Sequence, residues 1–112
     1  MREMDTLRGV LMSVAFVAAA LPGALHAGVT ASRQAELLHL LKHDCGSCHG
    51  LTLMGGLGPA LLPQNLAGKS DGLLLQTILD GRKGTAMPPW RPFMSAEEAQ
   101  WLLELLRKGV PR

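Results

Sequence analysis

Several features that define common protein classes are scarce or missing in this chain of 112 residues. No run has the pattern of a good β-strand, which favours an all-α fold. Aromatic residues make up only 4% of the chain, so a small domain would have little apolar bulk for a core of its own. The net charge of +2 does not suggest nucleic-acid binding. No acid–base pair or nucleophile arrangement is visible, so the chain is not expected to be an enzyme by itself.

A long hydrophobic run is also missing. The apolar run from Val10 to Leu21 has 12 residues (21 − 9), fewer than the ~20 that span a bilayer. Two arginines precede it, and small residues up to Ala27 follow it. This order predicts a secretory signal peptide over residues 1–27, with an uncleaved anchor as the alternative. We expect a mature domain over residues 28–112 in the periplasm, with no stable membrane association after cleavage.

Cys45 and Cys48 are the only cysteines, and both lie in the run C-G-S-C-H that ends at His49. C-x-x-C-H is the attachment signature of c-type haem: two thiols form thioethers with the vinyl groups, and the histidine can bind the iron. The alternatives are a redox dithiol or half of a zinc site. The first lacks a strand–helix–strand context, and the second would need His39 and His43 as additional ligands. We therefore expect one covalent haem c, attached in an oxidising compartment.

Three main helices are expected from the apolar patterns. They cover Ser32–Asp44, Asp71–Asp80 and the segment that follows Ser95. Ser70 is predicted to cap the second helix and Gly81 to end it. Ser95 and the glutamate three residues later form a capping box for the third. Glycine and proline interrupt residues 50–69 and 82–92, which are expected as two long loops around the haem.

Met87 is the predicted second ligand of the iron. It lies 38 residues after His49 (87 − 49), and two prolines that stiffen the backbone follow it. The alternative is a core methionine, since methionine often fills gaps in cores. Met54 follows His49 too closely to reach the opposite haem face, and Met94 is expected to staple the last helix.

The motifs C-x-x-C-H, Gly58-Pro59 and Met87-Pro88-Pro89, set between terminal helices, resemble those of a small class I c-type cytochrome. The resemblance covers almost the whole mature chain. It implies that Pro59 presents its carbonyl group to the imidazole N–H of His49 and so orients the ring. It also implies that the first and last helices cross. The residues that this crossing would pair are Leu37 and Leu41 with Leu102 and Leu106.

The runs from Cys48 to Pro63 and from Gly84 to Trp90 are similar to the cytochrome c55X (NirC) family, encoded with cytochrome cd1 nitrite reductase in denitrifying bacteria. This resemblance implies a periplasmic carrier of single electrons with redox protein partners, nitrite reductase among them. A redox factor in haem d1 maturation is one alternative, and a gas-binding or catalytic haem with an open iron position is another. We expect a monomer.

Four cations lie in or beside the two predicted loops. They are Lys69, Arg82, Lys83 and Arg91. They are either solvated loop charges or a basic rim that steers the protein toward an acidic patch on a redox partner.

Overall fold

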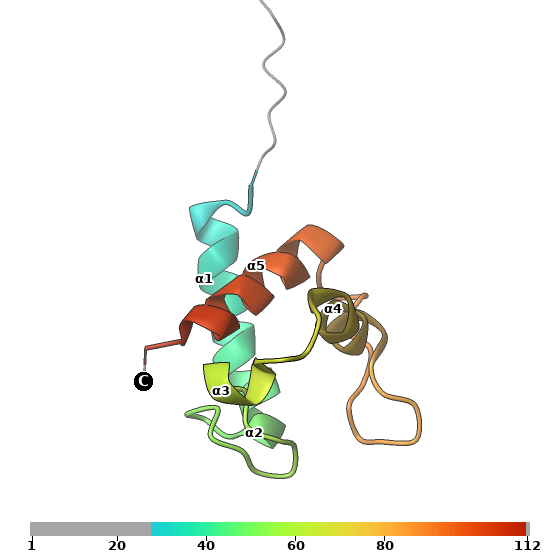
Figure 1. Cartoon of the computed structure of the whole chain (residues 1–112). Coiled ribbons are helices and arrows are strands. Elements are labelled where there is room, and N and C mark those ends of the chain that lie inside the picture. Colours follow the sequence, from blue (N-terminus) through green and yellow to red (C-terminus); the bar gives the residue numbers. More distant parts are fainter. Residues whose placement is uncertain (1–27, 112) are drawn as a thin grey trace, which may run out of the picture.

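Helices form the regular secondary structure of residues 28–111, which are the residues that the computed structural model describes (Figure 1). The predicted signal peptide lies outside this range. The elements in chain order are α1 (Ala31–Leu40), the π-helical segment η1 (Leu41–Cys45), α2 (Gly46–His49), α3 (Pro63–Leu66), α4 (Asp71–Asp80) and α5 (Ala96–Lys108). No strand occurs in the described range, and the expected all-α fold is confirmed. Within residues 28–111, no helix has the length and apolar character needed to cross a membrane.

The first helix is longer than the sequence predicts. α1, η1 and α2 follow one another without a break from Ala31 to His49. The hydroxyl of Thr30 caps the start by accepting a hydrogen bond from the N–H of Arg33 at 3.2 Å. The predicted end at Asp44 is wrong, because the first stop signal is Gly50 with φ of 92°. The haem-attachment motif therefore lies on a helix.

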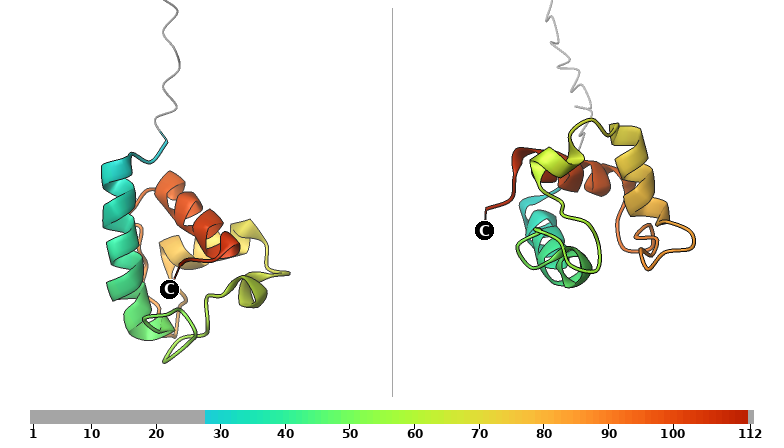
Figure 2. Two further views of the ribbon diagram at one scale, coloured as in Figure 1. Left: turned by 90° about the vertical axis from the view of Figure 1, so that its left-hand side faces the viewer. Right: turned by 60° about the horizontal axis from the view of Figure 1, so that its bottom comes forward.

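α5 crosses α1 and buries the main core between them (Figures 1 and 2). The four leucines of the implied crossing all belong to one buried cluster: Leu37, Leu41, Leu102 and Leu106. Leu37 has an exposed fraction of 0% and Leu102 of 2%. Burial of such side chains contributes about 1.5–3 kcal/mol each, so this contact anchors the fold.

Arg33 and Glu98 tie the same two helices together at their polar margin. The Nε of Arg33 donates to a Glu98 carboxylate oxygen at 2.7 Å, and other guanidinium nitrogens donate to Glu36 and to the carbonyl of Phe93. Glu98 also completes the predicted capping box, because it accepts from the N–H of Ser95 at 2.8 Å. The Arg33 hydrogen bond, aided by the Ser95 N–H, lowers the pKa of Glu98.

α4 has the predicted bounds, and the hydroxyl of Ser70 accepts from the N–H of Leu73 at 3.2 Å. The prediction that residues 50–69 contain no regular structure is wrong, because α3 forms at Pro63–Leu66. Proline stands at the start of α3, where its fixed φ favours a helix and its missing N–H costs nothing.

Arg107 of α5 joins three helices. Its Nε donates to Asp71 at 2.8 Å, and its other nitrogens donate to the carbonyl groups of Leu66 and Lys69 at 3.1 Å and 2.6 Å. Arg107 thus satisfies a carbonyl group at the C-terminal end of α3 and pairs with Asp71, the acidic residue at the start of α4. This contact fixes α3 and α4 relative to α5.

Candidate haem-attachment site

His49 ends α2, and it is nearly buried, with an exposed fraction of 9%. Its Nδ1 lies 2.6 Å from the carbonyl oxygen of Pro59. A carbonyl can only accept a hydrogen bond, so Nδ1 must carry a proton, and in the neutral ring Nε2 is then the nitrogen with the lone pair. The ring is therefore in the tautomer that can bind a metal through Nε2. Its role as iron ligand stays a prediction.

The loop after α2 folds back onto the end of this helix. The N–H of Gly55 donates to the carbonyl of His49, and the N–H of Gly58 donates to the carbonyl of Cys48, both at 2.8 Å. A β-carbon on Gly58 would lie 2.9 Å from the Cε1 and Nδ1 atoms of His49. Only glycine lets the chain pass this close to the ring and bring Pro59 into hydrogen-bonding distance.

Cys45 and Cys48 are half-buried and do not form a disulfide with each other. Burial, followed by the charge of Asp44, raises the pKa of the Cys45 thiol to about 11. Reactive redox cysteines have lowered pKa values, so this environment does not favour the dithiol hypothesis. In residues 28–111, no group of three or more histidine, cysteine or acidic side chains is placed to share a metal ion.

Met87 lies half-buried in the loop between α4 and α5. Its carbonyl accepts a hydrogen bond from the N–H of Arg82 at 3.2 Å, and its own N–H donates to the hydroxyl of Thr85 at 3.3 Å. This backbone hydrogen bond therefore joins the two ends of the segment from Arg82 to Met87. Sequence reasoning identified Gly81 as a helix end but did not predict this closure.

The exit of the same loop is attached to α4 as well. The N–H groups of Trp90 and Arg91 donate to the carbonyls of Ile78 and Leu79 at 3.1 Å and 3.0 Å. Arg91 adds an ion pair with Asp80, with Nη2 and a carboxylate oxygen 2.8 Å apart. Both ends of the loop are thus fixed to the last turn of α4. The loop around residues 50–62 and this loop extend toward the same end of the molecule (Figures 1 and 2).

The two competing methionines occupy different environments. Met94 is buried in the core with an exposed fraction of 5%, which agrees with its predicted position next to the cap of the last helix. Met54 is exposed at 59% in the loop that follows His49. Burial in the core thus keeps the Met94 side chain from binding the iron. The assignment of Met87 rather than Met54 as the second iron ligand stays a prediction.

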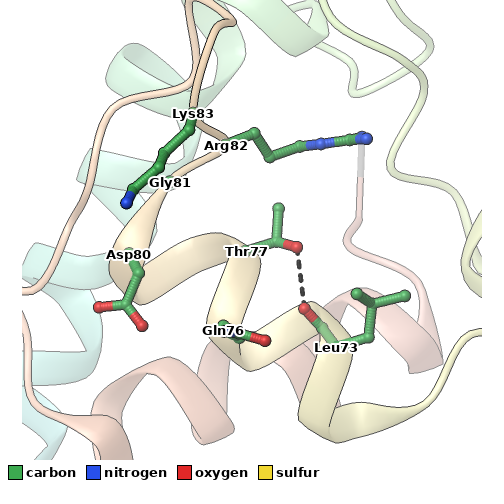
Figure 3. Close-up of a pocket in the computed structure, with 7 residues that line it drawn as sticks. All are labelled: Leu73, Gln76, Thr77, Asp80, Gly81, Arg82 and Lys83. Carbon is green, nitrogen blue, oxygen red and sulfur yellow. Dashed lines mark hydrogen bonds between the residues drawn. The ribbon is translucent and has the colours of Figure 1, made fainter.

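The four predicted rim cations fall into two pairs. Arg91 is bound to Asp80, and the Nζ of Lys69 donates to the carbonyl of Asn65 at 3.0 Å. By contrast, Arg82 and Lys83 have no side-chain partner among the described residues. They line an open hollow of about 350 Å³ at the end of α4 and extend in opposite directions there (Figure 3).

Large apolar side chains are exposed beside the two loops. Leu57 is exposed at 92%, Leu51 at 66% and Leu73 at 53%. Two thiols and a histidine on one continuous helix, Cys45, Cys48 and His49, are the donor set that covalent haem c uses.

Comparison with known proteins agrees with this chemistry. Residues 32–106 match the family model described as cytochrome c oxidase, cbb3-type, subunit III. Cytochrome c55X of Pseudomonas aeruginosa is 53% identical over 89 residues, which cover 80% of this chain and 75% of that protein. The solved structure of the c-type cytochrome NirC superposes with a TM-score of 0.69 at 56% identity, covering 70% of this chain and 93% of that one. The chain belongs to the cytochrome c55X family.

Membership of this family of c-type cytochromes accounts for the C-x-x-C-H motif and the helical fold. A more distant relative is the dihydro-heme d1 dehydrogenase of Pseudomonas aeruginosa. It is 33% identical over 73 residues, which cover 65% of this chain but only 15% of that protein. This chain is therefore similar in sequence to one small part of a larger protein.

Proposed function

We propose that this protein is a periplasmic, monomeric, monohaem c-type cytochrome that carries single electrons to cytochrome cd1 nitrite reductase in denitrification. The observation that carries the proposal is the hydrogen bond between His49 and Pro59, because it prepares Nε2 to bind iron. Membership of the cytochrome c55X family supports the same function. When bound, haem c supplies a one-electron ferric/ferrous couple.

Cys45, Cys48 and His49 would hold the haem from one helix. The thiols of Cys45 and Cys48 would form the thioethers, and Nε2 of His49 would bind the iron. Pro59 would keep the imidazole in one tautomer and one orientation. The two cysteines and the histidine come from one continuous helix, and Pro59 comes from the loop that folds back onto the end of this helix.

Met87 would supply the second protein ligand to the iron. Its loop is fixed to α4 at both ends, so the backbone can hold the thioether in place in both oxidation states. A thioether ligand favours the ferrous state and raises the reduction potential. A bound methionine also closes the iron to water and small gases, which distinguishes a carrier from a gas-binding haem.

Arg82 and Lys83 are the proposed docking cations. They are exposed and without side-chain partners among the described residues, and they lie at the start of the Met87 loop. An acidic patch on the reductase would attract them over a Debye length of about 10 Å at 0.1 M salt. Such contacts accelerate encounter and allow rapid release, as a carrier requires.

The direct test is rapid mixing of the reduced protein with oxidised cytochrome cd1 nitrite reductase. We expect saturable oxidation of the cytochrome with matching reduction of the reductase. Failure to exchange electrons at low salt would reject the carrier role.

A second candidate is a redox role in haem d1 maturation. It is favoured by the similarity to the dihydro-heme d1 dehydrogenase, an enzyme whose name refers to haem d1. A deletion strain separates the two functions. A nitrite reductase without haem d1 in that strain would support maturation, and a reductase with a full d1 complement but slow nitrite reduction would support the carrier.

A further inference from the structure

His39 and His43 form a close pair outside the haem site. Both are exposed, and their ring centroids lie 4.3 Å apart with the planes tilted by 41°. Residues 28–111 contain one other histidine, His49, which is buried and bound to Pro59. The pair is thus the accessible imidazole cluster of the described chain.

The helix geometry explains why the rings meet. His39 lies in the last turn of α1, and His43 lies in η1. Residues four apart are already neighbours on an α-helix. A π-helical turn holds more residues than an α-helical turn, so each residue after Leu41 rotates less around the helix axis. His43 therefore lies closer to the same face of the helix as His39. The same i, i+4 spacing lets two histidines bind one zinc ion in the H-E-x-x-H motif.

The surroundings leave the two rings available. Within residues 28–111 no hydrogen bond joins either ring to another group. Glu36, the nearest acid toward the N-terminus of α1, is already paired with Arg33, with Nη1 and a carboxylate oxygen 2.7 Å apart. The flanking charges of Lys42 and Asp44 cancel, so the site is neither repelled nor attracted by strong local charge.

We propose that His39 and His43 form a surface site for one divalent first-row transition-metal ion, Cu²⁺ or Zn²⁺. Imidazole nitrogen suits both ions. Two protein ligands leave further positions for water, or for the same pair from a second copy in a four-coordinate site. Affinity should be weaker than that of a structural site with four ligands from one chain. The inference does not depend on the proposed electron-carrier role.

The test is calorimetric titration of the haem-loaded protein with Zn²⁺. We expect saturable binding with one ion per chain, or one ion per two chains if pairs assemble. His39→Ala and His43→Ala should each weaken binding by at least about tenfold, because each removes one of two ligands. Lys42→Ala, between the pair, is the matched control and should bind as the parent does.

A second set of variants separates the loss of metal binding from a loss of helical structure. His39→Gln and His43→Gln retain polar side chains at exposed positions, and circular dichroism should show unchanged helix content. Electron paramagnetic resonance of the ferric protein with one equivalent of Cu²⁺ should show coupling to two nitrogens, lost in the double variant. No saturable binding of either ion, or equal binding by the double variant, would overturn the proposal.

Discussion

Gly81 and Met87 meet through their backbones. A β-carbon placed on Gly81 would lie 2.6 Å from the carbonyl oxygen of Met87 and 2.7 Å from the carbonyl carbon of Pro88. Gly81 also has φ of 68°, in the left-handed region. The proposed ligand loop therefore packs against the end of α4. Met87 can occupy its position only because Gly81 has no side chain.

Gly81→Ala should weaken the bond between the proposed thioether and iron. The added methyl group must displace the Met87 loop, at a cost of about 1–3 kcal/mol for overpacking. We expect a lower reduction potential and faster carbon monoxide binding by the ferrous protein. The control is Gly84→Ala, because Gly84 has φ of 76° but open space around it. Equal effects from both variants would show that backbone strain, not contact with Met87, is responsible.

Met87→Ala should leave the haem attached through Cys45 and Cys48 but open the iron to water or carbon monoxide. The potential should fall, because the ligand that stabilises the ferrous state is gone. Absorption spectra with and without carbon monoxide, together with a redox titration, make the measurement. An unchanged spectrum would refute Met87 as ligand, and Met54→Ala would then be the next variant to examine.

Gly58→Ala should disturb the histidine side of the site. Its β-carbon would lie 2.9 Å from the His49 ring, so the ring or the Pro59 carbonyl must move. We expect a loss of about 1–3 kcal/mol in the free energy of unfolding and a shifted potential. Gly72→Ala is the control, since nothing lies within 4 Å and alanine suits a helix better by up to about 1 kcal/mol. Normal stability and potential in Gly58→Ala would contradict the close packing.

Glu98→Gln should make stability less dependent on pH. The folded-state pKa of Glu98 is lowered, so its contribution is present above the unfolded value of about 4.3 and is lost as pH falls through the folded value. The variant should melt at a lower temperature than the parent at pH 7, and the gap should narrow as pH falls below about 4.3 and close only below the folded-state pKa. Glu97→Gln, an exposed neighbour, is the control. A gap that persists at low pH would mean that the loss is not electrostatic.

Lys83→Glu should slow electron transfer to the nitrite reductase at low salt. The difference should shrink as salt rises and the Debye length falls below about 10 Å. Lys108→Glu changes an exposed charge on α5 by the same amount and should matter less. The measurement is the second-order rate constant as a function of ionic strength. Equal slopes for the two variants would rule out docking at the end of α4.

Local signals explain where the helices could be predicted. α4 has its predicted bounds because Ser70 and Gly81 mark its two ends. The first helix was underestimated because its buried apolar positions end at Leu41, well before the helix itself ends at His49. α3 was missed because proline usually interrupts helices, although Pro63 stands at the one turn where it is favoured.

In the candidate site, too, features set by contiguous residues could be predicted and features set by tertiary contacts could not. The C-x-x-C-H motif is contiguous, so its chemistry is visible in the sequence alone. The partners of Arg91 and Lys69 could not be predicted, because Asp80 is brought to Arg91 by the tertiary fold and Asn65 lies in a helix that the sequence did not indicate. The attachment of Trp90 to Ile78 joins residues 12 positions apart (90 − 78), and no pattern of residue types predicts such a backbone bond.

The attachment of both ends of the Met87 loop to a single helix turn makes that loop a natural unit for grafting. Residues 82–89 follow Gly81 at the end of α4 and lead into Trp90 and Arg91, whose N–H groups donate to the carbonyls of Ile78 and Leu79. A segment of different composition could be exchanged there without altering the α1–α5 core. Redox tuning and fold stability would then be separable design variables in this cytochrome.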